Sequence, residues 1–261
     1  MRRLTLLIPF VLALAAPVWA AAPDARAALV SIIIDDIGDQ RVLGERAVDL
    51  PGPVTCAFLP LTPFAPALAE RAHFLGKEVM LHLPMQAKDE RSLGPAALRL
   101  DMTETEFLTT VATALAAVPH VRGVNNHMGS LLTRHPGHMD WLMQALSGSG
   151  HLYFVDSRTT RGTVAHMLAR EHGLPSVQRD VFLDNRPEPD AIRRQLAQLV
   201  RHARRHGTAV GIGHPYPATL EVLREALPEL EAQGVRLVPI SELIAHREQR
   251  RSESWRLSLS P

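Results

Sequence analysis

The sequence of 261 residues is short of cysteine, of aromatic side chains and of net charge, and each shortage excludes something. Cys56 is the single cysteine, so no intrachain disulfide can form, and its apolar setting in PVTCAFLP favours a buried thiol. The 28 lysine and arginine residues nearly balance 27 acidic ones, which argues against a nucleic-acid partner. Aromatic residues make up 5%, which leaves few side chains for a long stacking groove. No low-complexity tract occurs, and the 46% hydrophobic content suits one sizeable globular domain.

The N-terminal stretch MRRLTLLIPFVLALAAPVWAAAPDARA combines two arginines, an apolar run and small residues, which is the layout of a secretory signal. Cleavage after Ala20 fits best, so we expect a signal peptide over 1–20 and a linker over 21–27; a retained membrane anchor is the alternative. Without Arg2 and Arg3, 26 basic residues face 27 acidic ones. The mature chain is therefore expected in the periplasm or outside the cell, without stable membrane insertion, and its oligomeric state stays open.

In place of further long apolar runs, the chain has short runs rich in Val, Ile, Leu and Phe that alternate with amphipathic segments. The candidate strands are ALVSIIIDD, VTCAFLP, EVMLHLPM, VRGVNNH, LYFVDS, VQRDVFLD, TAVGIGHP and VRLVPIS. The glycines that follow periodic segments, as C′ glycines do at helix ends, are Gly76, Gly173, Gly207 and Gly234. Continuously apolar strands alternating with helices are typical of a parallel sheet covered by helices.

Seven or eight such units predict an α/β fold closed into a (β/α)7-8 barrel over residues 28–245. A polar tail over 246–261 is expected to fray. DDIGDQ follows the first strand where a dinucleotide-binding fold would have a glycine-rich phosphate motif, so that fold is not indicated.

Carboxylates, amides and imidazoles recur where the predicted strands end. They are Asp35 and Asp36 after the first strand, His82 in the third, Asn126 and His127 after the fourth, Asp156 after the fifth, Asp184 after the sixth and His214 after the seventh. In (β/α) barrels the active site lies at the carboxyl ends of the strands, where side chains from different strands meet. We therefore predict that these residues form one site and that NNHMGS is one of its walls.

Each of these residues also has a purely structural interpretation. Asp35 or Asp36 could cap the short helix expected next, since aspartate is a favoured N-cap. His82 could be a core histidine bonded to backbone, and Asp156 could stabilise the turn DSRTT that follows it. The remaining histidines, His138 among them, fall on helix or loop patterns and are expected at the surface.

Two imidazoles and one carboxylate make a ligand set suited to a divalent transition metal that keeps a position open for water, and zinc is the first choice. Such an ion lowers the pKa of its water to about 7 and polarises a carbonyl, as hydrolysis of an unreactive amide or ester requires. His82 and His127, with one carboxylate, are the candidate ligands.

Six segments in chain order resemble the polysaccharide deacetylase superfamily, and specifically its divergent, YibQ-like branch of exported proteins. They are SIIIDDIG, EVMLHLPMQ, GVNNHMGS, LYFVDSRTT, RDVFLDN and GIGHPYPATL, within about residues 28–243. The resemblance implies a distorted TIM-like barrel of the NodB type and metal-dependent removal of acetyl groups from a carbohydrate. It also implies that Asp35 is the catalytic base, Asp36 a metal ligand and His214 the general acid.

The chain departs from typical deacetylases at two motifs. It lacks the H-[ST]-x-x-H ligand motif, and it lacks R-x-P-x-[YF], whose arginine holds the base. His82 and His127 can replace the missing histidine pair only if their strands converge. Either Asp156 or Asp184 is expected to orient the ring of His214 and to raise its pKa.

The leading interpretation is a metal-dependent hydrolase that deacetylates an envelope or extracellular glycan, with Asn126, Ser157 and Arg158 as substrate-binding residues. A catalytically weak or inactive glycan-binding or scaffold protein with the same fold is the alternative, although such a protein would be expected to have lost Asp35 or His214. A metal-dependent phosphoesterase would need basic side chains converging on the transferred group, and only two arginines lie just past strand ends.

Overall fold

The computed structural model describes residues 27–89 and 91–259. The predicted signal peptide lies outside these residues, as does all of the predicted linker except residue 27. No helix in the described ranges is long and apolar enough to cross a membrane.

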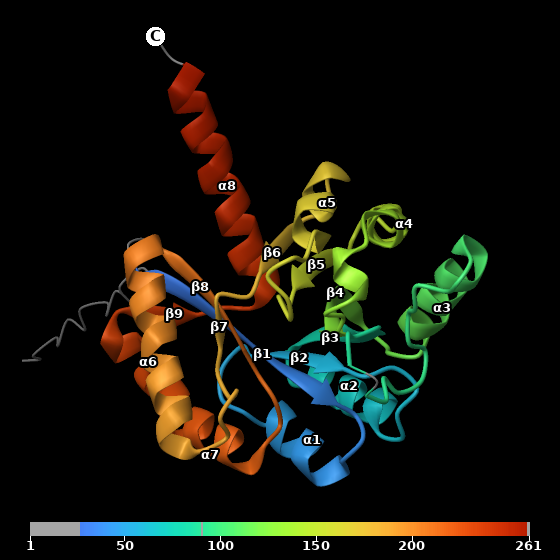
Figure 1. Ribbon diagram of the computed structural model, residues 1–261. Helices are drawn as coiled ribbons and strands as arrows, with labels where there is room; N and C mark the ends of the chain where they lie inside the picture. Colours follow the sequence, from blue (N-terminus) through green and yellow to red (C-terminus); the bar gives the residue numbers. More distant parts are fainter. Residues whose placement is uncertain (1–26, 90, 260–261) are drawn as a thin grey trace, which may run out of the picture.

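Strands and helices alternate along the chain, as the sequence predicts (Figure 1). In the described residues the strands are β1 (Ala28–Ile37), β2 (Thr55–Phe58), β3 (Glu78–Met85), β4 (Val121–Met128), β5 (Tyr153–Asp156), β6 (Ser176–Gln178), β7 (Val181–Phe182), β8 (Thr208–Gly213) and β9 (Val235–Leu237). The α-helices are α1 (Arg41–Val48), α2 (Ala65–Phe74), α3 (Glu104–Ala116), α4 (Pro136–Ser147), α5 (Ala165–Glu171), α6 (Pro189–His206), α7 (Pro217–Ala226) and α8 (Ile240–Leu259). Short 3-10 helices are η1 (Leu132–Arg134), η2 (Leu227–Glu229) and η3 (Glu231–Gln233).

The strands form one parallel sheet in the order β6-β5-β4-β3-β2-β1-β8-β7, and β9 pairs with the start of β1. The sheet is strongly curled. Although β2 and β3 lie between β1 and β4 in the sheet, the side chain of Asn125 on β4 donates a 2.7 Å hydrogen bond to the side chain of Asp35 on β1, which a flat sheet would not allow. No ladder joins β6 to β7 among the described residues. The predicted α/β barrel is therefore confirmed as a curled barrel that is open between β6 and β7.

Helix α6 packs on the outside of the sheet through an apolar stripe. On α6 the buried residues Ile192, Leu196, Leu199 and Val200 lie at positions i, i+4, i+7 and i+8, which share one face of a helix. Burying a side chain of this size contributes roughly 1.5–3 kcal/mol. The glycines predicted to end helices have left-handed φ angles, namely Gly76 (72°), Gly173 (66°), Gly207 (87°) and Gly234 (70°).

The C-terminal helix α8 fills the end of the barrel opposite the predicted site. Its residues Leu243 and Ile244 are buried in one cluster with inward-facing strand residues such as Val210 and Ile212. Further along, Arg247 donates 2.8 Å hydrogen bonds to the side chains of Asp180 and Thr208. The expected frayed tail is therefore wrong, since the helix runs unbroken through the predicted boundary at 245 to Leu259.

The segment VQRDVFLD was predicted to form one strand, but it forms two. Its two halves, β6 and β7, lie at opposite edges of the sheet order. Between them the backbone N–H of Arg179 bonds to Asp156 beside β6, and the N–H of Asp180 bonds to Val210 on β8. The chain thus crosses the open side of the barrel at Arg179 and Asp180.

Candidate metal centre and active site

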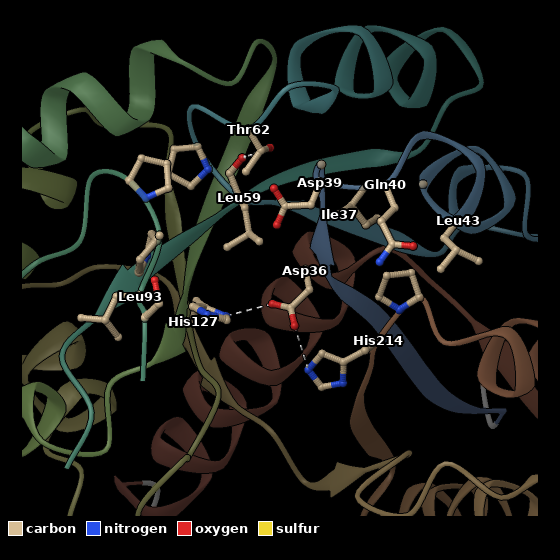
Figure 2. Close-up of a pocket in the computed structure, with 18 of the residues that line it drawn as sticks. Asp36, Ile37, Asp39, Gln40, Leu43, Leu59, Thr62, Leu93, His127 and His214 are labelled. Carbon is tan, nitrogen blue, oxygen red and sulfur yellow. Dashed lines mark hydrogen bonds and ion pairs between the residues drawn. The ribbon is translucent and has the colours of Figure 1, made fainter. Parts of the chain in front are cut away.

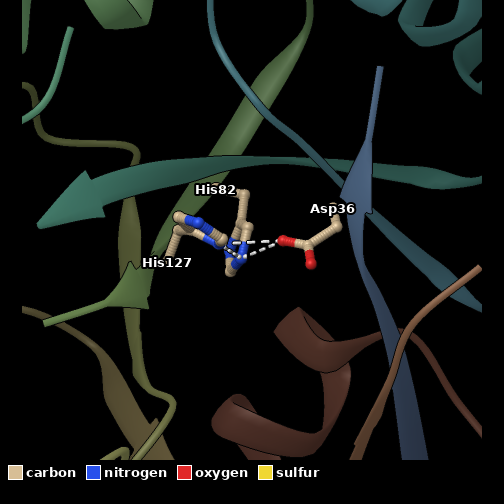
Figure 3. Close-up of side chains that lie close together, drawn as sticks. All are labelled: Asp36, His82 and His127. Atoms are coloured by element: carbon tan, nitrogen blue, oxygen red, sulfur yellow. Dashed lines mark hydrogen bonds and ion pairs between the residues drawn. The ribbon is translucent and has the colours of Figure 1, made fainter. Parts of the chain in front are cut away.

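The carboxyl ends of β1, β4 and β8 bring Asp36, His127 and His214 together at one end of the barrel (Figure 2), and β3 adds His82 to them (Figure 3). Parallel register aligns them, because His82 on β3 pairs with Asn125 on β4, and Ile34 on β1 pairs with Gly213 on β8. Residues two apart on a strand share a face, so Asn125 and His127 both point into the barrel. The convergence that the sequence required of separate strands is present.

The end of β1 is irregular, and this irregularity brings two adjacent aspartates to one site. Successive residues of a regular strand face opposite sides. The register with β2 shifts between Ile34 and Ile37, and Asp36 has a left-handed φ of 57°. This conformation costs a residue with a Cβ about 1–2 kcal/mol. Asp35 and Asp36 consequently both reach the cluster of side chains inside the barrel.

Asp36, His82 and His127 converge with the geometry of a metal-binding set (Figure 3). Asp36 Oδ1 lies 3.1 Å from His82 Nε2 and 2.9 Å from His127 Nδ1, and the two ring nitrogens are 3.1 Å apart. Ligand atoms around a tetrahedral zinc ion are about 3.4 Å apart. The three atoms therefore need to separate by only a few tenths of an ångström to accept such an ion.

The chemistry of these three atoms also fits a cation. Asp36 Oδ1 is buried and has no partner with hydrogen-bond geometry, although both ring nitrogens are close to it. Three atoms with lone pairs that face one another need protons or a positive ion between them. A divalent ion would satisfy all three together, and the residues present therefore fit the metal that the sequence predicts.

The electrostatics of the set favour positive charge. Burial raises the pKa of Asp36, but the neighbouring His127 and His82 outweigh burial and hold its pKa well below the usual value. Burial lowers the pKa of His82, yet the charges of Asp35 and Asp36 raise it overall. Asp36 therefore stays ionised, and the raised pKa of His82 favours a proton on that ring where no metal is bound.

Asp35 lies deeper than Asp36 and is only 2% exposed. Its Oδ1 accepts the 2.7 Å hydrogen bond from Asn125 and is 3.6 Å from His82 Nδ1, whereas Oδ2 makes no hydrogen bond with any described residue. Burial raises the pKa of Asp35, and the opposing effects of nearby histidines and of the Asn125 hydrogen bond do not cancel the increase. A raised pKa makes this carboxylate a stronger base.

His214 follows β8 and is held by Asp184, which follows β7. Asp184 Oδ1 is 2.9 Å from His214 Nδ1, and Oδ2 accepts hydrogen bonds from the His214 N–H (2.6 Å) and the Thr219 hydroxyl (2.8 Å). The other ring nitrogen of His214 lies 3.8 Å from Asp36 Oδ2. Burial lowers the pKa of His214, but the Asp184 hydrogen bond and the aspartates of β1 raise it to about 9. Of the two carboxylates expected to hold this ring, Asp184 is the one in contact.

A cavity of about 390 Å³ opens beside these side chains and is bordered by Asp36, His127 and His214 (Figure 2). Asp39 and Tyr216 also border it, and Tyr216 is 44% exposed. No lysine or arginine is among the described residues that line the cavity. The cavity thus offers an acidic and partly apolar environment around the metal-binding set.

The other predicted site residues lie away from this cavity. Asp156 accepts hydrogen bonds from the Arg158 N–H and the Thr163 hydroxyl, so it stabilises the turn after β5. Asn126 donates to the Met128 carbonyl and accepts from the Ser157 N–H, and it is also occupied within the protein. Substrate binding by Asn126, Ser157 and Arg158 therefore stays a prediction, and none of the three lines the cavity.

Three residues of this region make contacts that the sequence did not predict. Asn125 bonds to both Asp35 and His82, Thr219 bonds to Asp184, and Tyr216 borders the cavity. All three lie in the segments GVNNHMGS and GIGHPYPATL. The period-two rule could have indicated Asn125, since it shares a strand face with His127.

Comparison of the sequence with known proteins gives a match to the family of divergent polysaccharide deacetylases over residues 32–244. The chain is 36% identical over 214 residues to an uncharacterized protein of Haemophilus influenzae, with 82% of this chain and 76% of that protein covered. It is also 36% identical over 243 residues to the uncharacterized protein YibQ of Escherichia coli, with 93% of this chain and 73% of that protein covered.

Solved structures share the fold. The uncharacterized protein ATU2773 of Agrobacterium tumefaciens superposes with a TM-score of 0.81 at 23% identity, covering 84% of this chain and 90% of its own. The peptidoglycan deacetylase PdaC of Bacillus subtilis (mutant D285S) gives 0.56 at 14% identity, covering 92% and 100%. A mutant of BA3943, a CE4 family pseudoenzyme with restored enzymatic activity, gives 0.51 at 18% identity, covering 85% and 69%.

These likenesses confirm the barrel of the NodB type, and the sequence match covers the metal-binding set, Asp35, Asp184 and His214. With the family match over most of the chain and 36% identity to YibQ over 93% of it, the protein belongs to the divergent polysaccharide deacetylase family.

Proposed function

We propose that the protein is an exported, metal-dependent carbohydrate deacetylase that removes acetyl groups from an envelope or extracellular glycan. The observation that carries this proposal is one cavity bordered by two members of the metal-binding set, Asp36 and His127, and by His214, whose ring Asp184 holds. Membership of the family supports the same class of reaction.

Asp36, His82 and His127 would hold the metal, and zinc is the first choice for two imidazoles and one carboxylate. Such an ion, when bound, polarises the acetyl carbonyl and activates water. His82 is 2% exposed, whereas Asp36 and His127 are 31% and 16% exposed, so the substrate would approach from the side of Asp36 and His127.

Hydrolysis of the acetyl group also needs a base and an acid, which the chain supplies on two different strands. Asp35, with its raised pKa, takes the proton from the attacking water. His214 is protonated at neutral pH, because its pKa is about 9, and it donates a proton to the leaving nitrogen or oxygen. An amine leaves as the neutral molecule rather than as its anion, so this proton is essential for an N-acetyl substrate.

A catalytically weak or inactive glycan-binding protein with this fold is the second candidate. It is favoured by the missing H-[ST]-x-x-H and R-x-P-x-[YF] motifs and by the fold neighbour BA3943, which is itself a pseudoenzyme. The hydrogen-bonded positions of Asp35 and His214 favour turnover instead. A phosphoesterase is disfavoured, because the described lining of the cavity has no basic side chain to bind a phosphoryl group.

Acetate release from purified mature protein tests the proposal. Protein stripped of metal by a chelator should be inactive towards a panel of N- and O-acetylated oligosaccharides, and added zinc should restore activity. His214→Ala should lower kcat about a hundredfold or more without changing metal content, whereas His73→Ala, at an exposed position, should have no effect. If the metal-loaded wild type releases no acetate from any glycan, the binding-protein candidate takes the lead.

Export is the part of the proposal that depends on the N-terminal sequence alone. The charged, apolar and small-residue regions of 1–20 support cleavage near Ala20 and a location in the periplasm or outside the cell. The glycan substrate would then be the one that the mature protein meets there.

A further inference from the structure

Asn125 is buried between two groups of the proposed mechanism. It is 0% exposed, lies on β4 and pairs in register with His82 on β3. Its Nδ2 is 2.7 Å from Asp35 Oδ1, and its Oδ1 is 2.7 Å from His82 Nδ1. One amide therefore touches both a carboxylate of β1 and a histidine of the metal-binding set.

The chemistry of the neighbours fixes the orientation of this amide. An ionised carboxylate only accepts hydrogen bonds, so the NH₂ group of Asn125 must face Asp35. The amide oxygen then faces His82, and since an amide oxygen only accepts, Nδ1 of His82 must carry a proton. The reverse orientation would place two oxygens 2.7 Å apart without a hydrogen between them.

The tautomer of His82 follows from this orientation. With the proton on Nδ1, the lone pair of the neutral ring is on Nε2, the atom that faces Asp36 and His127 (Figure 3). A metal ligand needs its lone pair on that atom, and an outer partner of this kind fixes both ring orientation and tautomer. The same hydrogen-bonded amide occupies Oδ1 of Asp35 and leaves Oδ2 without a hydrogen bond to any described residue.

We propose that Asn125 is a positioning residue that links the two halves of the site: its oxygen prepares His82 for the metal, and its NH₂ group orients Asp35 as the base. The second half rests on the proposed function. Asn126 provides a contrast, because this neighbouring buried amide bonds to the Met128 carbonyl and the Ser157 N–H and touches neither group.

Zinc titration of the metal-free protein, in competition with a chromogenic chelator, tests the first half. Asn125→Leu removes the acceptor for His82 and should weaken zinc binding about tenfold to a hundredfold. Asn125→Asp keeps an oxygen acceptor at the same place, so its zinc affinity should be no more than about threefold weaker than that of the wild type. Folded Asn125→Leu protein that binds zinc like the wild type would overturn this half, as would equal losses in both variants.

A double-mutant cycle with Asp35→Asn tests the second half. At zinc concentrations that saturate every variant, Asn125→Leu should lower kcat about tenfold or more in the wild-type background. It should have little effect once Asp35 has been replaced, because residues that act as a unit are not additive. Asn126→Leu, the matched control, should have the same effect in both backgrounds. Equal losses for Asn125→Leu in both backgrounds would show a merely structural role and overturn the assignment.

The outcomes also separate this inference from the proposed function. A wild-type protein that releases no acetate would contradict the proposed function and with it the orientation of a base. The zinc titration would still decide whether Asn125 prepares His82. If Asn125→Leu fails to fold, Asn125→Ala, which also removes the acceptor, should show the same loss of zinc affinity, and wild-type affinity in Asn125→Ala would overturn this half.

Discussion

Replacing Asp184 by asparagine should lower the pKa of His214 and move the alkaline limit of activity to lower pH. The Asp184 side chain is fully buried, and its two oxygens accept from the ring and from the backbone N–H of His214 at 2.9 and 2.6 Å. Asparagine has nearly the same shape but no negative charge. The substitution therefore changes the electrostatics around His214 and leaves most of its packing in place.

The structure sets the expected size of this change. Burial lowers the pKa of His214, and the Asp184 hydrogen bond is the main effect that raises it to about 9. An opposite charge at this distance shifts a pKa by about 1–3 units, so the variant should titrate between about 6 and 8. At about pH 8 the wild-type ring is about nine-tenths protonated, and the variant ring would be half protonated or less. Activity at that pH should fall at least about twofold, and further the lower the pKa of the variant.

NMR titration of the ring in metal-free protein measures the pKa directly, and the alkaline limb of kcat in zinc-loaded protein measures its consequence. Asp190→Asn is the matched control, because it removes one carboxylate charge from an exposed position on α6. The control should leave both quantities unchanged. A His214 pKa that stays near 9 in Asp184→Asn, or an alkaline limb that does not move, would refute the electrostatic reasoning.

The same pair predicts how stability depends on pH. The folded-state pKa of His214 lies above its unfolded value of about 6.5, so the stabilisation is fully present below about pH 6.5 and is lost as the pH rises through about 9. The difference between the two pKa values corresponds to at most about 3.4 kcal/mol. Urea unfolding of metal-free protein should show this decline in the wild type and a smaller one in Asp184→Asn.

Three further predictions concern the metal, the substrate and export. His127→Ala should reduce bound zinc from about one equivalent to nearly none by elemental analysis, whereas His120→Ala should keep it; full occupancy in His127→Ala would remove His127 from the ligand set. Asp39 has no ion pair among the described residues, so the wild type should act on neutral or amine-bearing glycans roughly two- to tenfold better than on uronate-bearing ones. Asp39→Asn should reduce the ratio of kcat/KM for neutral glycans to kcat/KM for uronate-bearing ones, and the exposed control Asp101→Asn should leave this ratio unchanged. An unchanged ratio in Asp39→Asn would exclude an effect of the Asp39 charge. The exported protein should begin near Ala21 by N-terminal sequencing, and an intact Met1 in the membrane fraction would contradict cleavage.

The barrel and the location of the site follow from the sequence because both depend on regular patterns. Apolar strands that alternate with amphipathic helices determine a parallel sheet, and parallel strands place their carboxyl ends at one edge. His82 and His127 could therefore be paired across separate strands without the usual local motif. The register between β3 and β4 provides the spacing that H-[ST]-x-x-H provides within one segment of other deacetylases.

Features that depend on tertiary contacts were not predictable. VQRDVFLD has the composition of one strand, and only backbone bonds to two distant strands divide it at Arg179 and Asp180. The polar end of α8 remains helical although it was expected to fray. His138 was expected at the surface but is 7% exposed, because it packs against Phe107 and Trp141. The choice between Asp184 and Asp156 as the partner of His214 likewise required coordinates.

The buried charges of the site bear on whether the protein is an enzyme or a scaffold. Asp35, Asp36 and Asp184 are three carboxylates gathered at one end of a barrel. Burial removes water from Asp35 and Asp36, the charge of Asp36 repels that of Asp35, and Asp184 is 3% exposed. Asp36 also adopts a left-handed backbone conformation. Replacing buried charged side chains by uncharged ones often leaves stability unchanged or increases it, so a scaffold has no physical need for these charges. A cation bound by the metal-binding set and a proton on His214 would compensate these charges, and hydrolysis of an acetyl group requires both. The arrangement of charges therefore supports the proposed deacetylase over the scaffold.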